Sequence, residues 1–165
     1  MARRRAEVAP RILTNSKTLN VMRGNVGFVE DATPRFLISA RCLIYNNGSI
    51  LLVREEKEDT LETPGGTLKG SETIQDCAIR EVLEETGFAV ELVRVIAIVR
   101  HYDHRGNVLS ITYLAKLVKK AREQGKNIKE MRWVDKEGVK ALIKEGVVDW
   151  HDREPFRLFV EGKIQ

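Results

Sequence analysis

The fold is decided by one stretch, Gly66–Phe88, which reads GTLKGSETIQDCAIREVLEETGF. A helix places side chains three and four positions apart side by side, so Glu81, Glu84 and Glu85 would share one face. Like charges at that spacing oppose each other by roughly 0.2–0.5 kcal/mol per pair, which gives a purely structural helix little reason to carry them. Mg²⁺ takes oxygen ligands and often lies between protein carboxylates and substrate phosphates. The stretch therefore predicts a site for a divalent cation.

Signals for the start and end of this helix are also present. Thr73 is a suitable N-cap, and Asp76 follows three residues later as in a capping box. Gly87 provides the C-terminal stop. The apolar positions between them repeat every four residues and predict a buried stripe formed by Ile74, Ala78 and Val82.

The fixed residues of the stretch resemble the Nudix box, G-x5-E-x7-R-E-U-x-E-E-x-G-U, where U is a bulky apolar residue. Every fixed position is matched, by Gly66, Glu72, Arg80, Glu81, Val82, Glu84, Glu85, Gly87 and Phe88. The strand pattern on either side extends the likeness to most of Phe36–Val134. The alternative is a charged surface helix balanced by Arg80. That alternative does not explain Pro64-Gly65-Gly66, Glu72 or Gly87.

The resemblance implies an α+β fold of the α/β/α sandwich type, the Nudix fold, with a mixed β-sheet between helices. We expect a Nudix domain over residues 36–165 and an N-terminal extension over residues 1–35. The extension resembles one that builds dimers in ADP-sugar hydrolases, and alternating residues 18–29 could supply its strands. A homodimer is therefore one expected state.

Periodicity and turn residues predict the remaining elements. Strands are expected at Phe36–Tyr45, Ser49–Arg54, Leu92–Tyr102, Val108–Val118 and Met131–Val134. Helices are expected from Asp135, as N-cap, through Lys144 and over Glu154–Val160. The basic stretch Lys116–Arg122 is interpreted as a solvated loop, Pro64–Gly66 as a loop, and His101 as a residue at the end of a strand.

Composition limits the class of protein. With 165 residues and 42% apolar content, the chain suits one domain with a core. No apolar run approaches the ~20 residues of a membrane span, and no apolar segment follows Arg3–Arg5 as in a secretory signal. We therefore expect a cytoplasmic protein with no membrane partner, in which Cys42 and Cys77 are buried free thiols. The net charge of +4 suits an anionic ligand.

The resemblance also implies chemistry, namely hydrolysis of a diphosphate bond in a nucleoside diphosphate linked to another group. Mg²⁺ is the expected cofactor, with Mn²⁺ as an alternative. The matching metal ligands are Gly66, through its carbonyl, together with Glu81, Glu84 and Glu85. Expected catalytic residues are Glu81, Glu85 and Glu130, where Glu81 is the candidate base within the box and Glu130 the candidate outside it. Glu123 is a weaker outside candidate.

The substrate is less well defined than the reaction. Arg54, Tyr102 and Trp133 are the candidate substrate-binding residues, since aromatic rings can stack on a base. ADP-ribose or another sugar nucleotide is favoured, although the proline that often marks ADP-ribose enzymes is missing after the box. The alternatives are a nucleoside triphosphate, a dinucleoside polyphosphate, an RNA 5′ end, or nucleotide binding without catalysis. Nucleic acid ranks lower because no aromatic-rich RNA motif occurs.

Overall fold

The computed structural model describes residues 34–125 and 127–164. Residues 1–33 of the expected N-terminal extension, including its strands within residues 18–29, lie outside the described residues and stay a prediction. No helix in the described ranges has the length and apolar character needed to cross a membrane.

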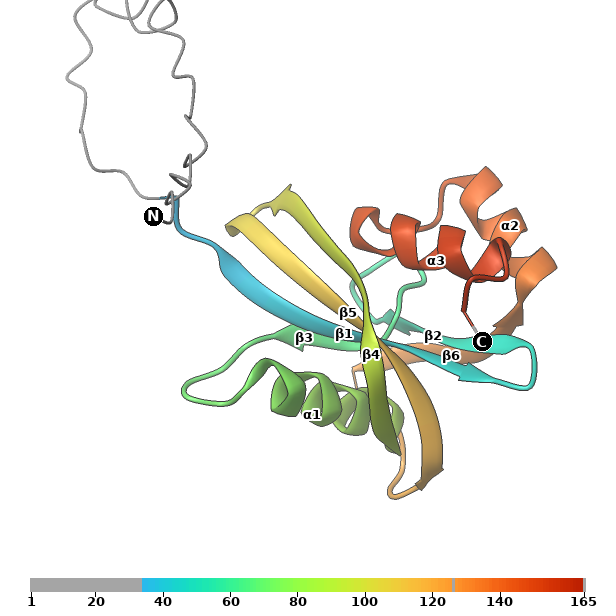
Figure 1. Ribbon diagram of the computed structural model, residues 1–165, viewed down its shortest axis with the longest axis horizontal. Helices are drawn as coiled ribbons and strands as arrows, with labels where there is room; N and C mark the ends of the chain where they lie inside the picture. Colours follow the sequence, from blue (N-terminus) through green and yellow to red (C-terminus); the bar gives the residue numbers. More distant parts are fainter. Residues whose placement is uncertain (1–33, 126, 165) are drawn as a thin grey trace, which may run out of the picture. The chain divides into compact units, whose positions relative to one another are not determined.

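The described chain forms a six-stranded mixed sheet and three α-helices (Figure 1). Five strands lie side by side in the order β4-β5-β1-β2-β6, and the sixth, β3, pairs with β1. β1 and β5 run parallel, whereas the other pairs are antiparallel. In chain order the elements are β1 (Leu37–Asn46), β2 (Ser49–Glu55), β3 (Gly65–Thr67), α1 (Ile74–Thr86), β4 (Phe88–Asp103), β5 (Gly106–Lys120), β6 (Ile128–Asp135), α2 (Lys136–Glu145), the 3₁₀ turn η1 (Trp150–Asp152) and α3 (Arg153–Val160).

Two separate apolar cores lie on the two faces of the sheet. Alternate residues of a strand point to opposite faces, and β1 divides its side chains accordingly. Cys42 and Ile44 pack with Ala78 and Val82 of α1, whereas Leu43 packs with residues of α2 and α3. The α/β/α sandwich is therefore confirmed.

Helix α1 has the predicted ends. The Thr73 hydroxyl accepts a hydrogen bond from the Asp76 amide at 3.1 Å. Gly87 adopts the left-handed conformation, with φ of 74°, and its amide donates to the Leu83 carbonyl. A side chain at this glycine would collide with the Arg122 carbonyl oxygen, which would lie 2.1 Å from a Cβ atom. The C-terminal end of the helix is thus fixed to the loop after β5.

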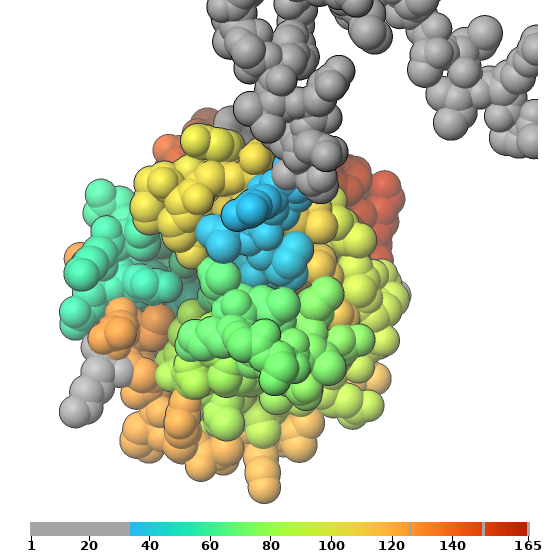
Figure 2. All heavy atoms as spheres, turned by 90° about the vertical axis from the view of Figure 1, so that its left-hand side faces the viewer, coloured from blue at the N-terminus to red at the C-terminus, as the bar shows by residue number. Residues whose placement is uncertain are grey.

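Strands β1 and β2 separate from each other a short way from their turn. β1 and β2 are paired only next to their turn, in the register Tyr45↔Ile50 and Asn46↔Ser49. Beyond that point β2 stays with β6, while β3 takes its place beside β1 at Ser39–Arg41. Figure 2 shows the start of β1 in blue between the β4–β5 hairpin in yellow and the box segment in green.

Two local predictions are wrong. Lys116–Lys120 continues β5 as a strand, because β4 pairs with it as far as Phe88↔Lys120. Those lysines are tolerated because most of the side chains there extend into solvent beyond the core. Gly65 begins β3, beside β1, instead of lying in a loop. In each case pairing with a distant strand determines the structure.

Candidate active site

Arg80 organises the glutamates of the box. Its guanidinium binds both oxygens of Glu72, at 2.7 and 2.9 Å. The same group donates to Glu81 at 2.7 Å and to Glu84 at 3.2 Å. Hydrogen bonds from Arg80 lower the pKa of Glu72 to about 2. The arginine therefore fixes the loop before α1 and two helix carboxylates in one cluster.

Glu81 lies directly against the main chain of Gly66. A Cβ atom at Gly66 would lie 2.6 Å from both the carboxyl carbon and one oxygen of Glu81. Only glycine, which has no side chain, leaves room for the carboxylate there. A side chain at Gly66 is therefore sterically excluded, and the glycine brings its backbone close to a proposed metal ligand.

Glu85 lies on the inner side of the cluster. Its Oε2 accepts a hydrogen bond from the Gly65 amide at 3.1 Å. Burial, which the charge of Arg41 offsets only in part, raises the pKa of Glu85 to about 8. A buried carboxylate of this kind gains from a nearby cation, which favours its charged form.

The donor set fits a divalent cation. Glu81 and Glu84 share the guanidinium of Arg80, Glu81 lies against Gly66, and Glu85 accepts from the Gly65 amide. Hard cations take such oxygen ligands. The ammonium of Lys69, an exposed side chain, already lies 3.8 Å from Glu81 Oε1 and 3.8 Å from Glu84 Oε2. This group shows that the two carboxylates can hold a positive charge between them.

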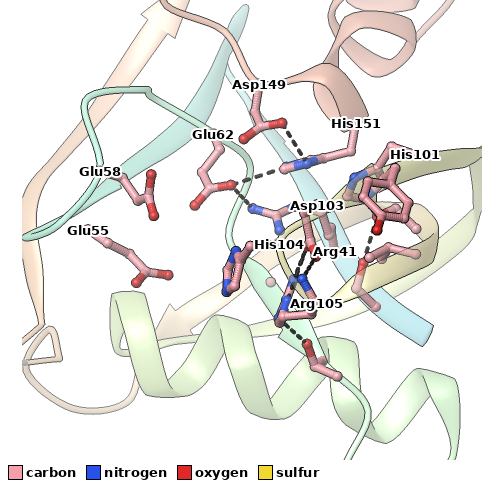
Figure 3. Close-up of a pocket in the computed structure, with 17 residues that line it drawn as sticks. Arg41, Glu55, Glu58, Glu62, His101, Asp103, His104, Arg105, Asp149 and His151 are labelled. Carbon is pink, nitrogen blue, oxygen red and sulfur yellow. Dashed lines mark hydrogen bonds and ion pairs between the residues drawn. The ribbon is translucent and has the colours of Figure 1, made fainter. Parts of the chain in front are cut away.

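A polar cavity of about 470 Å³ adjoins the box at Gly65 and Gly66 (Figure 3). Its walls come from β1, β3, the β4–β5 hairpin, η1 and the segment after β2. All three histidines of the chain line it. The other charged residues that line it are Arg41, Glu55, Glu58, Glu62, Asp103, Arg105 and Asp149.

A buried ion network lies behind this cavity. Arg41 donates to Glu62 Oε2 at 2.5 Å and to the Thr63 carbonyl at 2.6 Å. Burial works to raise the pKa of Glu62, but Arg41 and His151 hold it below its usual value. His151 Nδ1 lies 3.2 Å from Asp149 Oδ1, and its Nε2 lies 3.1 Å from Glu62 Oε2.

Asp152 closes the network from η1. Its two oxygens accept hydrogen bonds from the amide and the hydroxyl of Thr63, both at 2.6 Å. Burial and Arg41 work to lower the pKa of His151, but Asp152, Asp149 and Glu62 outweigh them and raise it to about 9. The network thus holds the segment that leads into Gly65 against the C-terminal part of the chain.

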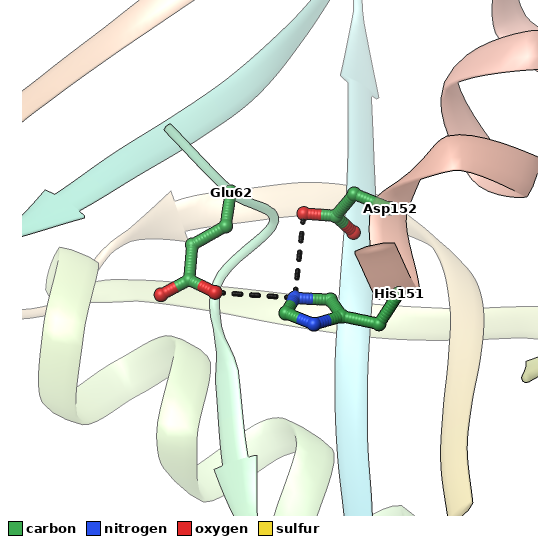
Figure 4. Close-up of side chains that lie close together, drawn as sticks. All are labelled: Glu62, His151 and Asp152. Atoms are coloured by element: carbon green, nitrogen blue, oxygen red, sulfur yellow. Dashed lines mark ion pairs between the residues drawn. The ribbon is translucent and has the colours of Figure 1, made fainter. Parts of the chain in front are cut away.

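Three residues of the network have side-chain atoms that lie as close together as the ligands of a metal ion. Glu62, His151 and Asp152 each offer a ligand atom within 4.8 Å of the others (Figure 4). Arg41 already binds the same Glu62 oxygen, however, and Thr63 occupies both oxygens of Asp152. Cations from within the chain neutralise this set, so the box is the better place for an added ion.

The predicted residues outside the box lie in different places. Tyr102 lines the cavity and is 78% exposed. Glu130 and Arg54 face each other across β6 and β2 at 3.2 Å, and the described lining of the cavity includes neither. Trp133 packs near Phe88, with ring centroids 6.5 Å apart, and lines a different hollow beside α2. Glu123 is exposed and pairs with Lys120.

Several residues at the cavity escaped the sequence analysis. Arg41, Glu62, Asp149 and His151 belong to no motif in the sequence. The one available signal was a buried-strand pattern interrupted by an arginine at position 41, because an arginine inside a core strand requires acidic partners.

Comparison with known proteins agrees with this architecture. The model of the NUDIX domain family matches residues 35–158. The chain belongs to the Nudix family. ADP-ribose pyrophosphatase of Methanocaldococcus jannaschii is 26% identical over 98 residues, which are 56% of this chain and 58% of that protein. Nucleoside diphosphate-linked moiety X motif 6 of Xenopus laevis is 32% identical over 77 residues, 46% of this chain and 36% of that protein.

Solved structures give the same fold. A NUDIX hydrolase from Nitrosomonas europaea superposes with a TM-score of 0.67 at 20% identity, covering 79% of this chain and 92% of that chain. The MutT protein from Methanosarcina mazei Go1 reaches 0.66 at 23% identity, covering 82% and 100%. At these identities the likeness establishes the fold alone. The chain spans 58% and 36% of the lengths of the two curated relatives.

Proposed function

We propose that this protein hydrolyses a diphosphate bond in a nucleoside diphosphate linked to another group, with Mg²⁺ as cofactor and Mn²⁺ as a substitute. One observation carries the proposal. The carboxylates of Glu81 and Glu85 lie against Gly66 and Gly65, and these glycines form one wall of a polar cavity. The proposed metal ligands therefore lie next to a cavity that could hold the substrate.

The chain's own groups define the roles. Glu81, Glu84 and Glu85, with the carbonyl of Gly66, would hold the ion. When bound, such an ion screens phosphate charge, orients the phosphates and acidifies the attacking water. The guanidinium of Arg105, which Asp103 fixes at 2.6 Å, stands at the cavity as a donor for substrate oxygens.

The contacts favour Glu85 as the group that takes the proton from water. Arg80 donates a hydrogen bond to the carboxylate of Glu81. Arg54 and Arg132 form ion pairs with the carboxylate of Glu130. Glu85, by contrast, accepts from the Gly65 amide. Its second oxygen is therefore the best placed of the three carboxylates to accept a proton.

Two further facts support the substrate class. An ADP-ribose pyrophosphatase is among the curated relatives. The cavity is lined mostly by charged and polar side chains, which suits the hydrophilic group of a sugar nucleotide.

The test is release of nucleoside monophosphate from a panel of nucleotides with Mg²⁺, with and without chelator. The panel holds ADP-ribose, other sugar nucleotides, dinucleoside polyphosphates, triphosphates and capped RNA. We expect turnover of sugar nucleotides that chelator abolishes. Turnover that survives the chelator, or preference for triphosphates or RNA, would overturn the proposal.

A further inference from the structure

A row of polar side chains crosses four strands at the floor of the cavity. Ser39 of β1 is the register partner of Thr67 on one side and of Ser110 on the other. Its hydroxyl oxygen lies 2.7 Å from that of Ser110, which lies 3.0 Å from His101 Nε2 on β4. All four residues line the cavity.

This row is confined to the cavity end of the sheet. Four residues further along the same strands, and on the same faces, Leu43 follows Ser39 and Leu114 follows Ser110, and both leucines belong to the core beneath α2 and α3. The two serines are only 5% and 1% exposed. Both hydroxyls are hydrogen-bonded within the row, so their burial costs little. A hydroxyl has one donor and two acceptor positions, so each serine keeps capacity for a further hydrogen bond to a ligand in the cavity.

The hydrogen bonds of the row can run in either direction. A neutral imidazole can accept at Nε2 or donate from it, depending on its tautomer, and each hydroxyl can do both. Burial and the nearby charge of His151 lower the pKa of His101, which keeps its ring neutral. Ser39, at the end of the chain of bonds, can thus offer a ligand either a donor or an acceptor. Such a group is complementary to a sugar hydroxyl, which can also donate or accept.

The other side chains that line the cavity also suit a sugar better than a nucleobase. A nucleobase needs a flat apolar surface for stacking. Among the described residues that line the cavity, Tyr102 supplies such a ring only at the exposed rim, and Val108 is the aliphatic one. The enclosed part of the cavity instead presents hydroxyl, imidazole and carboxylate groups.

We propose that Ser39, Ser110 and His101 form a subsite for the hydroxyl groups of the sugar that is linked to the nucleoside diphosphate. Thr67 extends this subsite toward the box, and its hydroxyl accepts a hydrogen bond from Arg105 at 3.0 Å. The assignment of the sugar as part of a substrate rests on the proposed function. The subsite itself can be tested by binding alone.

The experiment uses the full chain and the double variant Ser39→Ala/Ser110→Ala. Removing both partners of the 2.7 Å contact leaves neither hydroxyl unpaired, and the partly buried ring of His101, which loses Ser110, can pair with water instead. The fold should therefore be retained. Thr112→Val is the matched control, because Thr112 lies on the same face of β5, is buried, and its hydroxyl has no hydrogen-bond partner in the described structure.

Two readouts separate the subsite from the cleavage site. Calorimetry in chelator measures the Kd of ribose 5-phosphate and of glucose 1-phosphate. Kinetics compares ADP-ribose with the methyl ester of ADP, which keeps the diphosphate but lacks the distal sugar. We expect the double variant to weaken sugar phosphate binding and to raise KM for ADP-ribose by about three- to tenfold. KM for the methyl ester should stay unchanged, as should every value for Thr112→Val.

The experiment distinguishes a failure of the proposed function from a failure of the sugar subsite. If the wild type cleaves neither nucleotide but binds a sugar phosphate that the double variant has lost, the proposed function falls and the subsite stands. If the wild type binds neither sugar phosphate, the subsite is wrong. Equal effects of the double variant on both nucleotides would overturn it as well, since the serines would then serve the structure of the whole site.

Discussion

The protein holds two clusters of acidic side chains that are built in opposite ways. The box cluster lies on one helix and its preceding loop, with Glu84 nearly half exposed and Arg80 on its outer side. The buried cluster joins β1, the segment after β2 and η1, and it holds Arg41 and His151 among its acids. The first leaves carboxylate oxygens for an added cation, whereas the second neutralises its charge from within. Similar residue types thus form a proposed binding site in one place and a structural ion network in the other.

The largest effect should come from Glu85→Gln. The change removes a proposed metal ligand and proton acceptor, so kcat should fall by at least about 100-fold. The melting temperature should not fall, because a buried carboxylate is replaced by a neutral amide. Steady-state kinetics and thermal unfolding measure the two quantities. Glu123→Gln, at an exposed glutamate, is the control, and turnover near wild type in Glu85→Gln would refute the metal assignment.

Arg41→Met should act on stability first. It leaves Glu62 buried without its main cation, and breaking a buried ion pair in this way costs about 3–5 kcal/mol. Urea unfolding monitored by circular dichroism measures the loss. Arg157→Met is the control, because Arg157 also bridges two acids, Glu154 and Glu161, but on the surface. A loss no larger than that of the control would mean that the buried cluster is not structural.

The pH dependence of stability should report the buried cluster. His151 has a pKa of about 9 in the fold against an ordinary value of 6.5. Because the folded value is raised, the protonated ring stabilises the fold fully below pH 6.5, and this contribution is lost as the pH rises to about 9. The difference in unfolding free energy between wild type and His151→Gln should therefore shrink across that window. Parallel curves from pH 6 to pH 10 would contradict the assignment.

The smallest effect is expected from Lys69→Gln. The Lys69 ammonium competes with an added ion for Glu81 and Glu84, but at 3.8 Å and on the surface it does so weakly. The Mg²⁺ concentration for half-maximal activity should fall by no more than about fivefold. A rise in that concentration would show that Lys69 assists the site instead of competing with it.

The two clusters also differ in how far the sequence predicts them. The spacing of Glu81, Glu84 and Glu85 lies within two helical turns, so a periodic pattern predicts their proximity. Arg41 and Glu62 are 21 residues apart, and Thr63 and Asp152 are 89 apart. Only the pairing of strands and the packing of η1 bring them together. The caps of α1 were predicted for the same local reason, whereas the sandwich was predicted from the resemblance to the Nudix family. The full length of β5 was missed because a distant partner sets it.

The separation of β2 from β1 divides the chain into parts that can change independently. The proposed metal ligands lie on α1 and its glycine turn, while the opposite walls of the cavity come from the β4–β5 hairpin and η1. Inserting residues between Asp103 and Gly106 would enlarge the compartment for the leaving group without shifting a single box glutamate. Changes in the hairpin can therefore alter which substrate fits the cavity, while the groups proposed to cleave the diphosphate bond stay in place.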